Sequence, residues 1–459
     1  MAGKKQSLIP EEKLAQALVP QDQQPYKLPK GWVWTYLLDG FAKCCDSSRK
    51  PVSASERATL KGDIPYYGAT GQVGWINDYL TNEELVLIGE DGAPFLDVLK
   101  DKAYIINGKA WINNHAHILK SYFGHIGNLY LVHYLNSFDY RGFVNGTTRL
   151  KLTQGNMKKI PIPLPPLPEQ QRIVSRIESL FTKLDAARDK LQQVLDTQEA
   201  RRAAILHEAF SGGWGTGDSE EGRVKSEEGD GLAEGTVSVP EGWKVVRLSD
   251  VCTVNPKKLN VKDKDDKLKV SFFPMASLNE ELGEITKPEI KDLVDVKKGF
   301  TNFQEGDVVF AKITPCMENG KSAVIGPLVN QIGYGTTEFF VLRCHDDLYN
   351  RFLFHLVRSI KFRSEAKAQM TGAVGQQRVP KHFLEQYEFL LPPMEEQVRI
   401  VEIIDNLYEK EYKMKNAAQS ALAQIDLLKK AILARAFRGE LGTGDPEDPD
   451  VLDLLKQCL

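Results

Sequence analysis

Two long stretches of the chain carry apolar residues at alternating steps of three and four. The first stretch places them at Ile173, Ile177, Leu180, Leu184, Ala187, Leu191 and Val194. The second places them at Ile400, Ile404, Leu407, Met414, Ala418, Ala421, Ile425, Leu428 and Ile432, with Glu411 interrupting the series. This spacing is typical of the a and d positions of a coiled coil. A Pro-Pro pair precedes each stretch and forbids an earlier helix start. We predict two helices of about 40 residues, each roughly 60 Å long.

The two helical stretches are copies of one sequence. Residues 164–218 match the residues 227 positions later, and 23 of these 55 positions are identical without a gap. The copies begin with Leu164-Pro165-Pro166 and Leu391-Pro392-Pro393 and end with Gly-Thr-Gly-Asp. A second pair of matches lies upstream, where Pro29-Lys30-Gly31-Trp32 corresponds to Pro240-Glu241-Gly242-Trp243. Each half of the chain therefore opens with a Pro-x-Gly-Trp element and closes with a long helix.

The segments between these landmarks share little sequence and are expected to mix α and β structure. Short strands are predicted at 85–88, 103–106, 307–311 and 338–343, and short helices at 10–19, 127–137 and 347–363. Two related long helices in one chain favour an antiparallel intramolecular coiled coil. The alternative is that each helix packs on its own domain or on a partner protein.

The predicted fold class is α+β: two α/β domains joined by two long antiparallel helices that form an intramolecular coiled coil, with a pseudo-two-fold internal repeat. The predicted parts are an N-terminal extension (1–27), the first α/β domain (28–163), a central long helix (164–212), an acidic linker (213–239), the second α/β domain (240–390), a C-terminal long helix (391–439) and an acidic tail (440–459).

Charge does not separate the possible functions. The net charge is -3 over 459 residues, but residues 213–239 and 440–459 together contribute -10. The remaining domains are mildly basic, so the overall value neither excludes nor favours a nucleic-acid partner.

Composition indicates a water-soluble chain. No run approaches 18 apolar residues, and the first residues lead into no apolar segment of a secretory signal. The six cysteines form no CxxC pair and no metal-ligand spacing. A reduced, cytoplasmic protein without a metal site is expected.

Enzyme motifs are incomplete throughout the sequence. An adenine methyltransferase needs an Asn/Asp-Pro-Pro-aromatic loop, yet each Pro-Pro pair here is preceded by leucine. Gly320-Lys321-Ser322 resembles the end of a P-loop, but Pro315 stands where the upstream glycine is required. We therefore expect no catalytic residues.

The duplicated Leu-Pro-Pro-(x)2-Glu-Gln-x-Arg-Ile-Val junction, the Pro-x-Gly-Trp openers and the Ala-Ile-Leu…Ala-Phe helix ends resemble the specificity (S) subunit of type I restriction–modification systems. The resemblance covers nearly the whole chain. It implies that each α/β domain is a target-recognition domain, which reads one half of a bipartite, asymmetric site on double-stranded DNA, and that the helices set the spacer. It also implies that the helices dock two methyltransferase (M) subunits, which use S-adenosylmethionine to methylate adenine at N6. Through them, restriction (R) subunits that use ATP and Mg would join, and this chain itself would need no cofactor.

Candidate DNA-reading residues come from dense polar stretches, because base edges are read by forked donors and amides and phosphates by cations and small donors. In the first domain these are Lys109, Asn113, Asn114, His115, Thr147, Thr148, Arg149 and Lys151. In the second they are Lys312, Asn319, Lys321, Thr336, Thr337, Gln376, Gln377 and Arg378. Polar hairpins and ordinary turns are the competing interpretation of these segments.

The junction residues match the family more closely. They are Glu169, Gln170, Arg172, Glu396, Gln397 and Arg399. They could anchor the base of each helix to its domain, contact the methyltransferase, or cap the helix and form local ion pairs.

Two other classes of function remain open. A coiled-coil interaction scaffold would show no DNA sequence preference under any condition. An enzyme in its own right would methylate DNA without a partner.

Overall fold

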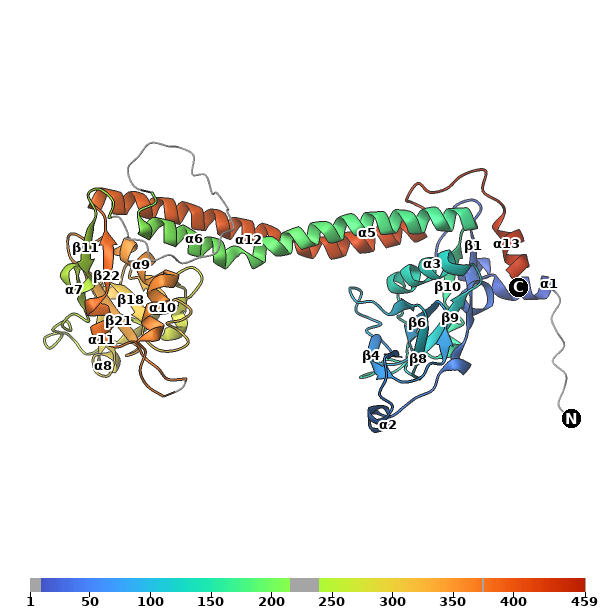
Figure 1. Ribbon diagram of the computed structural model, residues 1–459, viewed down its shortest axis with the longest axis horizontal. Coiled ribbons are helices and arrows are strands. Elements are labelled where there is room, and N and C mark those ends of the chain that lie inside the picture. The colour runs from blue at the N-terminus through green and yellow to red at the C-terminus, as the bar shows by residue number, and fades with distance from the viewer. Residues whose placement is uncertain (1–9, 215–238, 374, 459) are drawn as a thin grey trace. The chain divides into compact units, whose positions relative to one another are not determined.

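The computed structural model describes residues 10–214, 239–373 and 375–458. The chain divides into two compact units, one made of Met1–Gln192 with Gln419–Leu459 and the other of Gln193–Ala418 (Figure 1). Most of the predicted acidic linker lies outside the described residues. Each unit contains a recognition domain and part of the long helices.

The recognition domain of the first unit has two four-stranded sheets. One has the order β2-β9-β6-β7, and all its pairs are antiparallel. The other has the order β4-β3-β8-β5, in which β3 and β8 run parallel. The strands are β2 (Ala42–Cys44), β3 (Ile64–Gly68), β4 (Gly71–Ile76), β5 (Thr81–Asn82), β6 (Leu85–Gly89), β7 (Ala103–Ile106), β8 (Lys109–Ile112) and β9 (Ala116–Ser121). Helix α3 (Gly124–Ser137) packs on β6, β7 and β9.

The recognition domain of the second unit repeats this plan. Its sheets have the orders β12-β21-β18-β19 and β16-β13-β20-β17, and the second again contains one parallel pair, β13 with β20. The strands are β12 (Cys252–Val254), β13 (Lys269–Phe273), β16 (Glu289–Asp292), β17 (Thr301–Phe303), β18 (Val308–Ala311), β19 (Ser322–Val324), β20 (Gly333–Gly335) and β21 (Phe339–Cys344). Helix α9 (Asn350–Arg358) packs on β18 and β19. The short strands predicted at 85–88, 103–106, 307–311 and 338–343 are confirmed.

A two-stranded antiparallel ribbon connects each recognition domain to its helix. It consists of β1 (Val33–Tyr36) with β10 (Pro161–Leu164) in the first unit, and of β11 (Lys244–Arg247) with β22 (Glu388–Leu391) in the second. The second strand of each ribbon ends at the leucine of the Leu-Pro-Pro motif. Each long helix therefore starts directly after its ribbon.

The long helices are α5 (Leu167–Asp196), α6 (Gln198–Ser211) and α12 (Met394–Phe437). In the first unit α5 packs on the C-terminal part of α12, where Asp185 pairs with Lys429 at 2.6 Å and Arg188 pairs with Asp426. In the second unit α6 packs on the N-terminal part of α12, where Arg201 pairs with Glu411 at 2.8 Å. Partners rise along one helix as they fall along the other, so both pairings are antiparallel. The predicted coiled coil is confirmed.

The predicted apolar seam is wrong at two positions of α12. Met414 is 38% exposed and Leu428 is 49% exposed. At the second position the helix turns Lys429 inward instead, and its ammonium lies 5.0 Å from the centre of the Phe181 ring. The interruption at Glu411 is filled by the guanidinium of Arg201, which donates to both carboxylate oxygens.

The first long helix is interrupted at Thr197, which separates α5 from α6. Backbone hydrogen bonds still continue through this point, because the Thr197 amide donates to Gln193 and the Arg201 amide donates to Thr197. The Thr197 hydroxyl also donates to the Gln193 carbonyl, and the Arg201 guanidinium donates to the Val194 carbonyl across the interruption.

Both terminal segments fold onto the first unit. Helix α1 (Pro10–Ala17) contacts α13 (Val451–Cys458), and Val451 and Leu455 are buried in the same core as Leu37 and Phe41. The tail predicted only as an acidic segment therefore contains a short amphipathic helix. Among the described residues, no helix has both the length and the apolar character needed to cross a membrane.

Candidate nucleic-acid interface

The two predicted DNA-reading segments of the first domain come together around a pair of carboxylates. Asp91, just after β6, accepts from His115 Nδ1 at 2.8 Å and from Arg149 at 2.7 Å. Glu90 pairs with Lys151 at 2.9 Å. The segments 109–115 and 147–151 thus meet at one turn. Thr147, Thr148 and Asn114 are exposed beside it.

Not every predicted residue of this group is free to contact a ligand. Asn113 is buried, and its side-chain oxygen accepts from the His115 amide. Lys109 is exposed, and its ammonium lies 5.0 Å from the centre of the Tyr79 ring. Asn113 therefore shapes the turn, and the exposed face consists of Asn114, His115, Thr147, Thr148, Arg149 and Lys151.

A buried charge network supports this face from below. His117 Nδ1 lies 2.6 Å from Asp46, and its Nε2 lies 2.8 Å from the Leu152 carbonyl. Arg49 bridges Asp46 and Glu90. Burial alone would raise the pKa of Glu90, but hydrogen bonds from Arg49 and Lys151 hold it below its ordinary value. The pKa of Asp46 is likewise lowered, against the effect of burial, by His117, the Ile118 amide and Arg49.

Asp46, Glu90 and His117 are close enough together to suggest metal ligands. The Arg49 guanidinium, however, pairs with both carboxylates and supplies the positive charge there. We assign no metal to this group.

The predicted residues of the second domain fall into two groups. Arg378 donates to both oxygens of Glu338 at 2.9 Å, and the hydrogen bond lowers the pKa of Glu338. Lys312 joins this group, because its amide donates to the Glu338 carbonyl and its ammonium lies over the Phe340 ring. Thr336 accepts from the Glu338 amide, and the Gln377 carbonyl accepts from Thr314.

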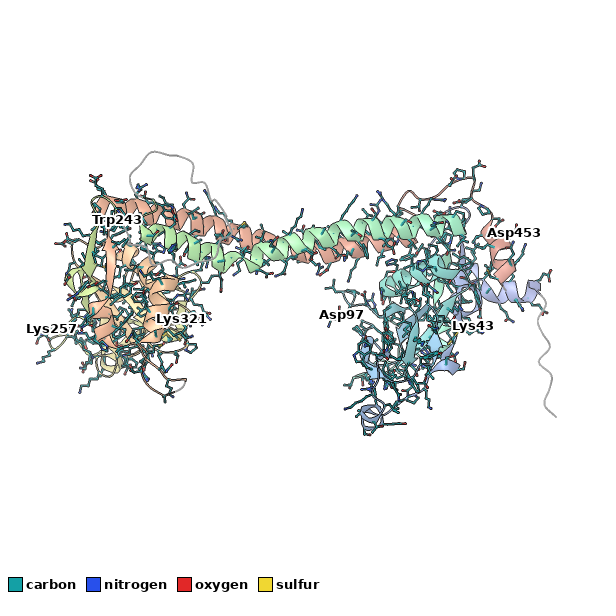
Figure 2. All side chains as sticks on the ribbon, viewed as in Figure 1. Lys43, Asp97, Trp243, Lys257, Lys321 and Asp453 are labelled. Carbon is teal, nitrogen blue, oxygen red and sulfur yellow. The ribbon has the colours of Figure 1, made fainter. Side chains whose placement is uncertain are left out.

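The exposed members of this first group are Thr337 and Gln376. Asn319 and Lys321 form the other group, around Glu280. The Asn319 amide donates to that carboxylate at 3.2 Å, and the Lys321 ammonium lies 4.0 Å from it. Figure 2 marks Lys321 on this part of the second domain.

The junction residues contact their own domains in both units. Trp32 Nε1 donates to Glu169 at 2.7 Å, and Trp243 Nε1 donates to Glu396 at 3.0 Å (Trp243 is labelled in Figure 2). The side-chain amide of Gln170 donates to the Pro165 carbonyl, and that of Gln397 donates to the Pro392 carbonyl. The tryptophan of each Pro-x-Gly-Trp element is thus fixed to the start of its helix.

The two arginines of the junction hold the segment that follows each helix. Arg172 donates to the Thr443 carbonyl at 2.7 Å, and Arg399 donates to the Trp214 carbonyl. These contacts support the role of a domain anchor for all six junction residues.

Both halves match one protein family. The profile described as "Type I restriction modification DNA specificity domain" matches residues 29–196 and 240–423. The chain belongs to this family. The two matches each begin at a Pro-x-Gly-Trp element and include the recognition domain and the start of the long helix.

Similar proteins are described as specificity subunits of type I restriction enzymes. The EcoAI specificity subunit of Escherichia coli is 33% identical over 261 residues, which are 48% of this chain and 44% of that relative. The match therefore spans less than half of that relative's length. A putative specificity subunit of Haemophilus influenzae is 26% identical over 80% of this chain and 86% of its own length.

Solved structures show the same fold. The HsdS subunit of Thermoanaerobacter tengcongensis superposes with a TM-score of 0.57 at 20% identity, over 92% of this chain and all of that one. A chain from work on complex assembly and conformational transition of a type I R-M system gives 0.60 at 20% identity, over 91% of this chain.

Reasoning from the sequence missed the carboxylates that organise both faces of this specificity protein. Asp91 and Glu90 follow a buried strand and precede a glycine, which was the available signal. Glu338 also lies directly before a buried strand. No local sequence signal pointed to Arg49 or Asp46. Arg49 lies 41 residues from its partner Glu90, and Asp46 lies 71 residues from its partner His117.

Proposed function

We propose that this chain is the DNA-reading subunit of a type I restriction–modification complex and performs no chemistry itself. Each recognition domain reads one half of a bipartite, asymmetric site on double-stranded DNA. The observation that carries this proposal is the repeat: one junction is built twice, around two domains whose exposed polar faces differ. Different faces favour different half-sites.

The proposed reading face of the first domain surrounds Asp91, and that of the second domain surrounds Glu338. Arg149, Lys151, Lys312 and Arg378 would position phosphates, while amides and carboxylates would meet base edges. A carboxylate such as Asp91 can accept from the amino group of cytosine, and the amide of Gln376 suits adenine.

The long helices are proposed to set the spacer and to dock two adenine-N6 methyltransferase subunits, with restriction subunits joining through them. S-adenosylmethionine would belong to the methyltransferase, and ATP and Mg to the restriction subunits. Leu427 and Leu428 of α12 are 62% and 49% exposed and would suit such docking. The complex would act on DNA in the cytoplasm.

A map of N6-methyladenine tests the reading function. Cells that carry this chain with its methyltransferase are compared with cells from which only this chain is deleted. We expect loss of one bipartite, asymmetric motif. Retention of every motif, together with a methyltransferase that fails to co-purify with the chain, would overturn the proposal in favour of a scaffold unrelated to DNA.

The spacer function is tested by shortening both helices together. Deleting residues 188–194 and 420–426 removes one heptad from each helix and keeps the Asp185–Lys429 pair. Seven residues rise about 10.5 Å, which corresponds to about three base pairs. We expect the spacer of the methylated motif to shorten by about three base pairs, or methylation to stop. An unchanged motif and spacer would contradict the proposal.

A further inference from the structure

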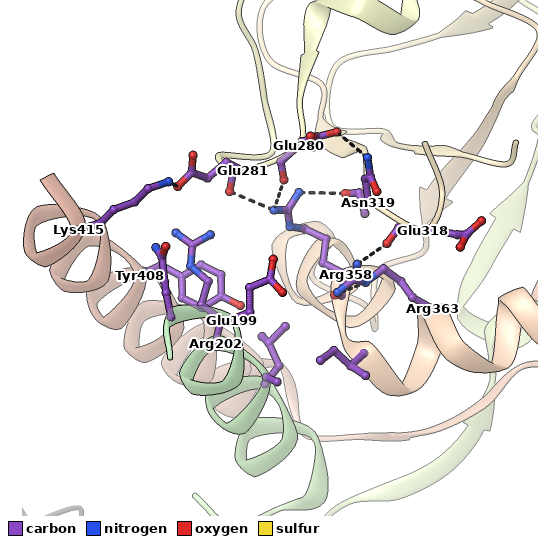
Figure 3. Close-up of a pocket in the computed structure, with 15 residues that line it drawn as sticks. Glu199, Arg202, Glu280, Glu281, Glu318, Asn319, Arg358, Arg363, Tyr408 and Lys415 are labelled. Atoms are coloured by element: carbon purple, nitrogen blue, oxygen red, sulfur yellow. Dashed lines mark hydrogen bonds and ion pairs between the residues drawn. The ribbon is translucent and has the colours of Figure 1, made fainter. Parts of the chain in front are cut away.

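A pocket of about 570 Å³ opens in the second unit, where α6 and α12 meet the recognition domain (Figure 3). Three arginines line it: Arg202 from α6, Arg358 at the end of α9, and Arg363 from α10 (Ile360–Ala368). Figure 3 shows the guanidinium groups of Arg202 and Arg358 and the carboxylate of Glu199 facing the same space. The pocket therefore concentrates positive charge beside a single free acid.

Two of these arginines are held by backbone carbonyls. Arg358 donates to the carbonyls of Gly320 at 3.0 Å, Glu280 at 2.8 Å and Glu281 at 3.1 Å. Arg363 donates to the carbonyls of Glu318 and Arg358. Neither forms an ion pair with a carboxylate in the part of the chain that the structure describes. Carbonyls fix the orientation of the guanidinium groups but leave their charge uncompensated.

The acids around the pocket are already paired with lysines or amides. Glu281 pairs with Lys415 at 2.5 Å, and Glu318 pairs with Lys367 at 2.5 Å. Glu280 accepts from Asn319, and the Lys321 ammonium lies 4.0 Å from its carboxylate. This leaves Glu199 opposite three guanidinium groups, so one negative charge faces three positive charges.

Arg202 has no hydrogen bond or ion pair with any described residue. Its guanidinium lies 5.0 Å from the centre of the Tyr408 ring, and its Nε is buried without a partner among the residues described. The side-chain nitrogen of Gln198, which also lines the pocket, is likewise buried and unpartnered within the described chain. Burial lowers the pKa of Arg358 to about 10, and the charges of Arg363 and Arg202 act in the same direction. An anion in the pocket would relieve all of these effects.

The first unit shows the same positions with the charge compensated. At the offset of 227, Lys429 corresponds to Arg202, Phe181 to Tyr408 and Asp185 to Tyr412. Lys429 lies over the Phe181 ring at 5.0 Å, as Arg202 lies over Tyr408, but Lys429 also pairs with Asp185. The second unit has Tyr412 in place of that acid, so the positive charge of Arg202 is not compensated by a carboxylate of any described residue.

We propose that this pocket binds a phosphate of the DNA backbone, with Arg202 as the contacting cation and Arg358 and Arg363 stabilising the bound charge. This rests on the proposed DNA-reading function and adds an anchoring site beside the predicted DNA-reading residue Asn319, which lies at the edge of the pocket. A phosphate offers several acceptor oxygens, which suits converging guanidinium groups. Such a contact is independent of base sequence and positions the second recognition domain on the duplex.

The test measures how DNA affinity depends on salt. The full chain in complex with its methyltransferase is titrated onto a 30-base-pair duplex of arbitrary sequence at several salt concentrations. Loss of one phosphate contact lowers the slope of log K against log salt by about 0.9. We expect this change for Arg202→Gln and not for Arg202→Lys, which keeps the charge. The matched control is Lys429→Gln in the first unit, for which we expect no change in slope.

A second variant leaves the lining residues of the pocket intact. Tyr412→Asp introduces the acid that the first unit has at this position and should pair with Arg202. We expect it to lower the slope by about 0.9 as well, with Tyr412→Asn as the neutral control. Thermal unfolding checks that each variant folds like the parent.

The outcomes separate this proposal from the reading function. A normal N6-methyladenine motif together with an unchanged slope in Arg202→Gln and Tyr412→Asp would overturn the phosphate site alone. A weaker affinity for the methyltransferase with an unchanged DNA slope would overturn it in favour of a protein-docking pocket. Failure of the parent complex to prefer any DNA motif would count against the reading function instead.

Discussion

The two units share one junction, and they differ in the segments around it. In the first unit, Gly439 after α12 lies against Pro29, and a Cβ on that glycine would be 2.3 Å from the Pro29 ring. In the second unit, Gly212 after α6 lies against Pro240 at the same distance. Both glycines have positive φ, which only glycine adopts readily. The geometry at the base of the helices has thus been preserved in both copies.

The ribbon next to this junction differs between the units. Trp34 on β1 is buried, its Nε1 donates to the Tyr26 carbonyl, and the Val19 amide donates to the Trp34 carbonyl. The corresponding residue on β11, Val245, is 58% exposed. The first unit is therefore covered by its own N-terminal segment, whereas no described residue covers Val245 in this way. The junction is therefore alike in the two units, and the surfaces around it differ.

The largest effect is expected from removing the junction tryptophans. Trp32→Ala and Trp243→Ala each delete a buried indole and leave the Oε2 atom of Glu169 or Glu396 without its donor. We expect a loss of about 3 to 5 kcal/mol in the free energy of unfolding of the unit that carries the change. Hydrogen exchange followed by mass spectrometry measures each unit separately, through peptides of β6 and β18.

The matched control keeps a ring at each position. Trp32→Phe and Trp243→Phe retain most of the buried area and lose only the hydrogen bond, so a smaller loss is expected. Equal losses in both units from a single Trp→Ala change would contradict two separately anchored junctions.

A second difference concerns two equivalent histidines. His133 on α3 packs edge-on against Phe181 at 5.8 Å, and His355 on α9 packs edge-on against Tyr408 at 5.8 Å. Asp405 lies 2.9 Å from His355 Nε2. His133 Nε2 is buried without a hydrogen-bond partner in the described part of the chain. Burial lowers the pKa of His133 to about 4, while Asp405 opposes the same effect of burial on His355.

The first unit should therefore lose stability on mild acidification. The unfolded chain binds a proton at the ordinary histidine pKa of about 6.5, while folded His133 binds it only near 4. The stabilising contribution is complete above about pH 6.5 and is lost as the pH falls toward 4, at about 1.4 kcal/mol per pH unit and about 3 kcal/mol in all. Hydrogen exchange at a series of pH values measures this slope in peptides of the first unit.

His133→Leu is the variant that removes this dependence. It should make the stability of the first unit nearly constant between pH 6.5 and 4.5. In the second unit, Asp405→Asn removes the group that favours protonated His355, so its dependence on pH should become steeper. A slope in the first unit that survives His133→Leu would assign the dependence to other groups.

Sequence reasoning found the repeated elements of the fold but not the contacts between them. The heptad spacing and the duplicated Leu-Pro-Pro motif were sufficient to predict two long helices and their antiparallel pairing. The division of the first helix into α5 and α6 at Thr197 was not predicted, because the heptad spacing continues through this residue. The exposure of Leu428 was not predictable, since Ile425, Lys429 and Ile432 satisfy the same spacing once a lysine packs over an aromatic ring. Helical periodicity treats lysine as polar and ignores its apolar stem.

The candidate interface was predicted only in part, because the sequence shows local polar segments but not the distant residues that they contact. Dense polar stretches located the segments around His115 and Arg149, and the structure brings them to one carboxylate. The uncompensated charge of Arg202 could not be read from the sequence, because Arg358 and Arg363 reach the same pocket from helices more than 150 residues away. The offset of 227 does show Tyr412 where the first copy has Asp185. The consequence for charge can be recognised only from the structure, in which Asp185 pairs with Lys429, the counterpart of Arg202.

The smallest predicted effect concerns the second oxygen of each junction glutamate. Glu169 Oε1 accepts from the Thr443 hydroxyl at 3.2 Å, whereas Glu396 Oε1 is buried without a hydrogen bond from any described residue and lies 3.5 Å from Arg399. Thr443→Val removes that donor and should cost the first unit about 1.5 kcal/mol, because the acceptor is charged and buried. Thr443→Ser keeps the hydroxyl and should restore most of the loss in the same hydrogen-exchange measurement.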